Sequence, residues 1–179
     1  SDVYKRQMLS HRWNGVYGEM YFSAAIAAAF TVDHPREALE LALGEIPAEC
    51  AMADAVRWAL DRADGIRDYR EARAAVDGRF GEMSCVHTLN NAALTVFGLV
   101  LGGRDFTRVI GETVAMGLDN DCTAATAGSI AGAVIGIENI PEQWTRNFND
   151  VSFSYLNGVE RFSIRGMTER FLRFARGER

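Results

Sequence analysis

Residues 117–136, GLDNDCTAATAGSIAGAVIG, constrain the fold most because they predict a helix made almost entirely of small residues. Within a helix over 123–137, Gly128, Gly132 and Gly136 recur every four residues and share one stripe. A glycine inside a helix costs about 1 kcal/mol relative to alanine. The stripe therefore predicts a neighbouring helix that packs closely enough to offset this cost.

The same segment does not fit a membrane span. Glycines at this spacing also occur where membrane helices dimerise. However, the apolar stretch is short for a bilayer, and Asp121 and Glu138 bracket it closely. The sequence therefore predicts a buried helix of a soluble protein with no membrane partner.

The composition favours one globular domain in a reducing compartment. Hydrophobic residues make up 48% of the chain, charged residues 24%, and the formal net charge is −5, with no basic block for direct nucleic-acid binding. Cys50, Cys85 and Cys122 are widely spaced and form no C-x-x-C pair, which argues against a disulfide framework or a zinc site. We therefore expect a cytoplasmic protein.

Hydrophobic periodicity predicts helices and almost no strand. The predicted helices have Asp, Pro or Gly near their ends, as capping requires. They cover residues 17–30, 68–76, 88–101, 123–137 and 165–176, and others start near Asp33, Pro47, Asp105 and Pro141. Because the stretch 88–101 is apolar on nearly all sides, we expect it to be a central, buried helix. The sequence predicts an all-α, orthogonal multi-helix bundle.

Polar residues at the start of the predicted central helix have structural roles in this interpretation. His87 is expected to cap or anchor the helix. Asn90 and Asn91 are expected to satisfy backbone groups at a crowded junction.

Asp119 and Asp121 lie in a short segment between two predicted helices, the first of which ends at Gly117. Two carboxylates this close repel each other unless they are protonated or neutralised by a cation, and Mg²⁺ takes one or two carboxylates while keeping waters. Thr123 and Ala124 exclude an EF-hand loop, which needs Asp or Asn and then Gly at those positions. The alternative is that Asp121 only caps the next helix, with Asp119 solvated beside it.

The whole segment resembles the C-terminal metal motif of the ADP-ribosylglycohydrolase family, G-x-D-x-D-[T/C]-x-A followed by a small-residue helix. Residues 10–30, SHRWNGVYGEMYFSAAIAAAF, resemble the family's [S/T]-H segment, Gly-containing turn and Ala-rich helix. Residues 87–92, HTLNNA, with the following apolar run and the start at Asp105, resemble the helix pair before the metal loop. The resemblance covers residues 9–147 in matching order, and it implies the all-α fold of this family.

The resemblance also implies a metal site. Asp119 and Asp121 are the implied ligands, and the family uses two Mg²⁺ ions, or Mn²⁺ in their place. Cys122 stands where better-known members have a metal-binding Thr, and a neutral thiol is a poor ligand for Mg²⁺. Thr123 or a water is the alternative source of that oxygen, and the alternative role for Cys122 is that of a small buried residue.

Substrate contacts are implied near the N-terminal motif. His11 matches a family position that contacts the ribose or phosphate end of ADP-ribose, beside the turn that contains Gly15 and Gly18. Trp13 and Tyr17 are candidates for stacking on adenine, and packing is the alternative role of these aromatic side chains.

The first residues have a different origin in this interpretation. Residues 2–7, DVYKRQ, are what a transposon end used in sequencing-library preparation encodes in one reading frame. We therefore expect residues 1–7 to be a non-native leader, Met8 to be internal, and residues 8–179 to be the C-terminal portion of a single, incomplete domain. The family's Thr-Asp-Asp metal motif and its catalytic carboxylate are expected upstream, since no Thr-Asp-Asp run occurs in this sequence. The catalytic residue is thus not named, and the chain alone is expected to be inactive.

The resemblance implies metal-dependent hydrolysis of the glycosidic bond that joins ribose C1 of ADP-ribose to its acceptor, a protein side chain or a small molecule. The metal ions would orient the distal ribose and activate a water. A non-catalytic structural or ligand-binding relative with the same fold is the alternative, because the family also includes lens crystallins.

Overall fold

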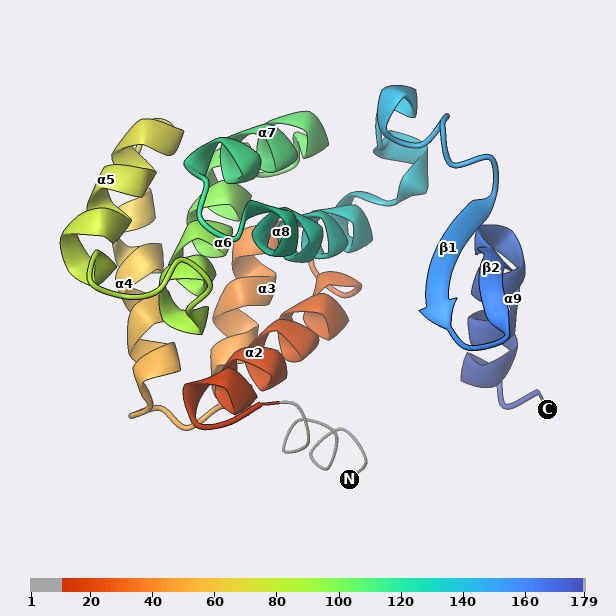
Figure 1. The fold of residues 1–179 in the computed structure, drawn as a ribbon, viewed down its shortest axis with the longest axis horizontal. Helices are drawn as coiled ribbons and strands as arrows, with labels where there is room; N and C mark the ends of the chain where they lie inside the picture. The colour runs from red at the N-terminus through yellow and green to blue at the C-terminus, as the bar shows by residue number, and fades with distance from the viewer. Residues whose placement is uncertain (1–10, 179) are drawn as a thin grey trace. The chain divides into compact units, whose positions relative to one another are not determined.

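The computed structural model describes residues 11–178, and the chain divides after Ile140 into two compact units (Figure 1). The predicted leader, residues 1–7, lies outside the described residues. The first unit is helical, which confirms the predicted all-α class. Its elements are α2 (Asn14–Ala29), α3 (Pro35–Ala42), η1 (Leu43–Glu45), α4 (Ala51–Ala63), α5 (Tyr69–Phe80), α6 (Thr88–Gly102), α7 (Phe106–Met116), α8 (Asn120–Ile135) and η2 (Ile137–Asn139).

Helix α6 is the centre of this unit, as its apolar sequence predicted. It packs against α2, α3, α4, α5, α7 and α8 (Figure 1). The side chains of Leu94, Phe97 and Leu99 are fully buried, and each burial contributes about 1.5–3 kcal/mol relative to exposure. Trp58 of α4 meets Phe97 edge-on, with ring centroids 5.8 Å apart. Most of the hydrophobic core is therefore assembled around one helix.

Several helix ends differ from the prediction. The N-cap of α3 is His34, whose Nδ1 accepts a hydrogen bond from the Arg36 amide at 3.2 Å, where the sequence had suggested Asp33. Helix α5 continues past the predicted end at residue 76, through Gly78, to Phe80. These differences arise because an imidazole nitrogen can accept a capping bond and because a helix tolerates an internal glycine.

Helices α6 and α7 approach each other closely at Gly98 and Gly102 of α6. A Cβ built on Gly98 would lie 1.9 Å from Thr113 Oγ1, and one on Gly102 would lie 2.4 Å from the backbone nitrogen of Val109. Thr113 is itself buried, and its hydroxyl donates to the Val109 carbonyl at 2.7 Å. Only glycine at these two positions lets α7 approach α6 this closely.

The glycine stripe predicted for α8 is confirmed only at Gly128. A Cβ there would lie 3.1 Å from Cδ1 of Ile110 on α7, whereas at Gly132 the nearest atom would be at an ordinary 3.7 Å. Gly136 is the C-cap, with φ of +77° and no neighbour within 4 Å of a Cβ. It ends the helix instead of packing, because its backbone conformation favours glycine.

The second unit contains a hairpin that the sequence analysis did not predict. Pro141 is followed only by a short 3-10 turn, η3 (Glu142–Trp144), instead of the expected helix. Strands β1 (Val151–Leu156) and β2 (Val159–Ser163) pair antiparallel, and helix α9 (Ile164–Ala175) follows. The overlooked signal was alternating polarity in VSFSYL followed by Asn157-Gly158, a pair of residues favoured in two-residue turns.

None of the helices in residues 11–178 combines the length and the apolar character needed to cross a bilayer.

We expect Gly98→Ala to lower the free energy of unfolding by about 1–3 kcal/mol, because the new methyl group overlaps the Thr113 hydroxyl. Urea unfolding followed by circular dichroism measures this change. Gly111→Ala in α7 is the matched control, because a Cβ there meets nothing within 4 Å, and it is expected to be neutral or stabilising by up to about 1 kcal/mol. Equal stability of the two variants would contradict the close contact.

Asp150 gives the second unit a pH dependence. Its carboxylate accepts hydrogen bonds from the Arg165 amide at 2.7 Å and the Ser163 hydroxyl at 2.7 Å, and these hold the pKa of Asp150 below its usual range. Because the folded pKa is the lower one, these bonds stabilise the junction of β2 and α9 above the unfolded pKa, and this stabilisation is lost as pH falls through the folded pKa. A carboxyl ¹³C titration should give a midpoint that rises in Ser163→Ala, and an unchanged midpoint would refute this explanation.

Candidate functional site

Two residues with positive φ turn the chain from α7 into α8. Gly117 has φ of +73° and Leu118 has φ of +60°, which is unfavourable for a residue with a Cβ. Arg73 on α5 holds the end of α7, because its Nη1 donates to the Met116 carbonyl at 2.8 Å. The loop before α8 therefore contains an unfavourable backbone conformation at Leu118, next to a helix end that Arg73 holds.

The side chain of Asn91 ties this loop to the start of α6. The Asp119 amide donates to Asn91 Oδ1 at 3.2 Å. Asn91 Nδ2 in turn donates to the carbonyls of Cys85 at 2.8 Å and His87 at 2.9 Å. The predicted backbone role of Asn91 is confirmed, and the residue also positions Asp119.

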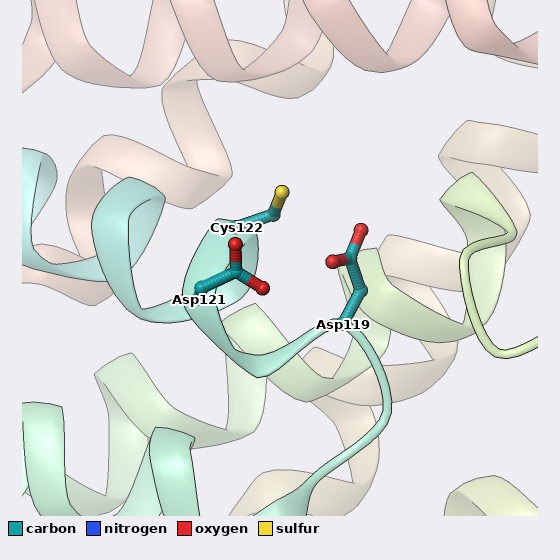
Figure 2. A group of neighbouring side chains, drawn as sticks. All are labelled: Asp119, Asp121 and Cys122. Atoms are coloured by element: carbon teal, nitrogen blue, oxygen red, sulfur yellow. The ribbon is translucent and has the colours of Figure 1, made fainter.

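Asp119 is the N-cap residue of α8, and Asp121 lies in its first turn. The alternative in which Asp121 caps this helix is therefore wrong, and α8 starts at Asn120 instead of Thr123. The Asp119 side chain makes no capping hydrogen bond. One oxygen of each carboxylate and Sγ of Cys122 lie within 4.8 Å of one another (Figure 2). Two negative charges are thus gathered in one small volume.

Cys122 is a hydrogen-bond donor in this cluster. Its thiol bonds to the Asp119 carboxylate, and this bond, together with desolvation and the charges of Asp119 and Asp121, raises the pKa of Cys122. A protonated thiol is a weak donor and a poor ligand for a hard cation. The hard ligands available here are therefore the two carboxylates.

A cavity of about 430 Å³ opens beside the cluster, between α2, α6 and the start of α8. It brings together most of the residues that the sequence analysis proposed for metal and substrate. Those that line it are His11, Gly15, Gly18, Asp119, Cys122 and Thr123. Tyr17 packs against the core instead, and Asp121 is exposed beside the cavity without lining it.

A family model described as ADP-ribosylglycohydrolase matches residues 3–176, which is nearly the whole chain. The chain belongs to the ADP-ribosylglycohydrolase family. This family hydrolyses ADP-ribose linkages and is generally metal-dependent. No curated protein and no solved structure matches the chain.

The glycines of the N-terminal motif create space for neighbouring side chains. A Cβ on Gly18 would lie 2.6 Å from the hydroxyl oxygen of Thr88 on α6. A Cβ on Gly15 would lie 3.3 Å from Cδ2 of His11. In this member of the ADP-ribosylglycohydrolase family, the two glycines therefore leave room for the polar side chains of Thr88 and His11 at the cavity wall.

Glu19 is a cavity residue that the sequence analysis missed. Its carboxylate Oε2 lies 3.0 Å from His11 Nδ1, and its side chain is 17% exposed. Gly15, Gly18, Glu19, Phe22 and Ile26 all line the cavity from α2. Their spacing of three, four and seven residues marks one helix face, so this pattern was the available signal.

We expect Asn91→Ala to lower the free energy of unfolding by about 1–3 kcal/mol, because it leaves buried backbone groups without their partner. Loss of this support for Asp119 should also weaken Mn²⁺ binding by roughly tenfold or more. Denaturation and Mn²⁺ titration by electron paramagnetic resonance measure the two effects. Asn139→Ala is the control, since Asn139 bonds to the Ile135 carbonyl outside the loop, and equal Mn²⁺ affinities in both variants would contradict this role.

Proposed function

We propose that this chain supplies the Asp119–Asp121 part of a metal-dependent site that hydrolyses the glycosidic bond between ribose C1 of ADP-ribose and its acceptor. The observation that carries the proposal is the cavity that Asp119 and His11 both line, the first from the N-cap of α8 and the second from the segment before α2. Its volume of about 430 Å³ is within the usual range of small-molecule sites, about 300–1,000 Å³. Family membership supports the reaction class.

The donor set fits Mg²⁺ or Mn²⁺. The carboxylates of Asp119 and Asp121 would hold the cation, because hard cations prefer oxygen ligands and the Asp119 carboxylate has no capping role. Cys122 is not counted among the ligands in this proposal, because a thiol is a poor ligand for a hard cation. Thr123, which lines the cavity, is the alternative oxygen donor at this position. A bound cation would supply charge that orients the ribose and lowers the pKa of a water.

The residues around the cluster would bind and orient the sugar. His11, Ser23, Thr88 and Thr95 provide polar groups at the cavity wall. The apolar side chains of Phe22, Ile26, Val86 and Ala92 also line the cavity. They limit the number of ways in which a ligand fits. The proposal assigns the general acid to none of these residues, and the acceptor is a protein side chain or a small molecule.

Mn²⁺ binding tests the assignment of the ligands. We expect Mn²⁺ to broaden the amide signals of residues around Asp119 in the wild-type chain, because carboxylate oxygens bind it. Asp119→Asn and Asp121→Asn should each abolish this selective broadening. Asp61→Asn removes an exposed carboxylate from α4 and serves as the control. Broadening that persists in both site variants would refute the assignment.

Release of ADP-ribose tests the reaction. ADP-ribosylated protein and small-molecule acceptors are incubated with Mg²⁺ and with a protein in which a Thr-Asp-Asp segment of the family precedes this chain. We expect metal-dependent release that Asp121→Ala abolishes, and no release by the 179-residue chain alone. Absence of release from every acceptor, with Mn²⁺ affinity intact, would favour a non-catalytic binding protein.

A further inference from the structure

We propose that the Thr126 hydroxyl binds the nucleotide half of a ligand whose ribose lies at Asp119, so that the cavity selects a nucleoside diphosphate sugar over a sugar phosphate. The proposal rests on the proposed function, since it takes Asp119 as the place where the ribose is held. It assigns a ligand contact to a residue outside both the metal cluster and the N-terminal motif.

The Thr126 hydroxyl differs from other hydroxyls inside the helices in what it contacts. Those of Thr95, Thr113 and Ser129 each donate to the carbonyl four residues earlier, at 2.9, 2.7 and 2.9 Å. This bond to the preceding turn is one that a helical threonine commonly makes. Thr126 makes neither this bond nor any other side-chain hydrogen bond within the part of the chain that the structure describes. Its hydroxyl is therefore left for a ligand or a water.

The packing of α8 determines the direction in which Thr126 faces. Ala127 and Ile130 of the same helix are fully buried in the core. The residues from α8 that line the cavity are Asp119, Cys122, Thr123 and Thr126. Their spacing of three, four and seven residues marks one face of the helix. Because the core holds the rest of α8, the half-buried Thr126 side chain stays at the cavity wall.

The lining of the cavity extends further than a single sugar ring. Thr126 follows Asp119 by about two turns of α8, which corresponds to roughly 10 Å along the helix axis. On α2 the lining residues extend from Gly15 to Ile26, about 16 Å along the axis. A ribose 5-phosphate held at Asp119 ends short of Thr126, whereas a nucleoside diphosphate sugar continues into a second phosphate and a nucleoside. Only the longer ligand reaches this hydroxyl.

Apolar side chains in the same cavity favour the nucleotide over the acceptor as the group near Thr126. Phe22, Ile26 and Ala92 line the cavity together with Thr126. Ligand sites typically combine such apolar walls with a few polar groups that fix the orientation of the ligand. A nucleoside matches both features, because its flat base is largely apolar and its ribose carries hydroxyls.

Titration with two ligands of different length tests this assignment. The 179-residue chain is titrated with ADP-ribose and with ribose 5-phosphate in the presence of Mg²⁺, and amide chemical shifts give both affinities. Thr126→Val, which replaces the hydroxyl with a methyl group, should weaken ADP-ribose binding about three- to tenfold and leave ribose 5-phosphate binding unchanged. Thr126→Ser keeps the hydroxyl and should keep most of the affinity.

Ser129→Ala is the control for this titration. It removes an exposed hydroxyl from the same helix and should change neither affinity. ADP-ribose binding that is unaffected by Thr126→Val, an equal loss for both ligands, or no ADP-ribose binding by the wild-type chain would each overturn the proposal.

Urea unfolding separates ligand binding from a structural role. Thr126→Val should leave the urea midpoint unchanged, because no described residue bonds to this hydroxyl. Thr113→Val is the contrasting variant and should lower the midpoint, because it loses the buried bond to the Val109 carbonyl. A lowered midpoint in Thr126→Val that accounts for its lost affinity would overturn the proposal. If ADP-ribose binds through Thr126 but is released from no acceptor, the proposed hydrolysis fails while the role of Thr126 stands.

Discussion

The close contact between α6 and α7 is the constraint on which the candidate site depends. Gly98 and Gly102 remove the side chains that would hold the two helices apart, and Thr113 fills the space at Gly98. Because α6 also packs against five other helices of the unit, the position of α7 is fixed relative to all of them. The end of α7 leads directly into the loop that carries Asp119. A contact in the core thus determines where the carboxylates lie.

Two polar side chains convert this packing into a defined loop. Arg73 satisfies the last carbonyl of α7, and Asn91 accepts from the Asp119 amide. With its backbone held in this way, Asp119 faces the cavity next to Asp121, and repulsion between the two carboxylates favours a bound cation. Cys122 donates to Asp119, which gives that carboxylate a polar partner.

Local sequence patterns predicted the features that contiguous residues determine. The apolar stretch of α6 was correctly placed at the centre, and the segment around Asp119 was correctly identified as the place where two acidic side chains meet. The hairpin was missed because its alternating polarity extends over only a short segment, for which no strand was considered. Glu19 was missed because its partner His11 is eight residues away and the contact depends on how the chain enters α2.

The sequence by itself determined the helical class, the family and the acidic loop, since periodicity and motif spacing are properties of neighbouring residues. Only the tertiary structure decided which glycines bring helices together. Gly98 and Gly102 do so at the α6–α7 contact, whereas Gly136 of the more conspicuous small-residue segment only ends a helix. The spacing of four is the same in both helices, and the difference lies in which face meets a neighbour, which depends on packing between residues far apart in the chain.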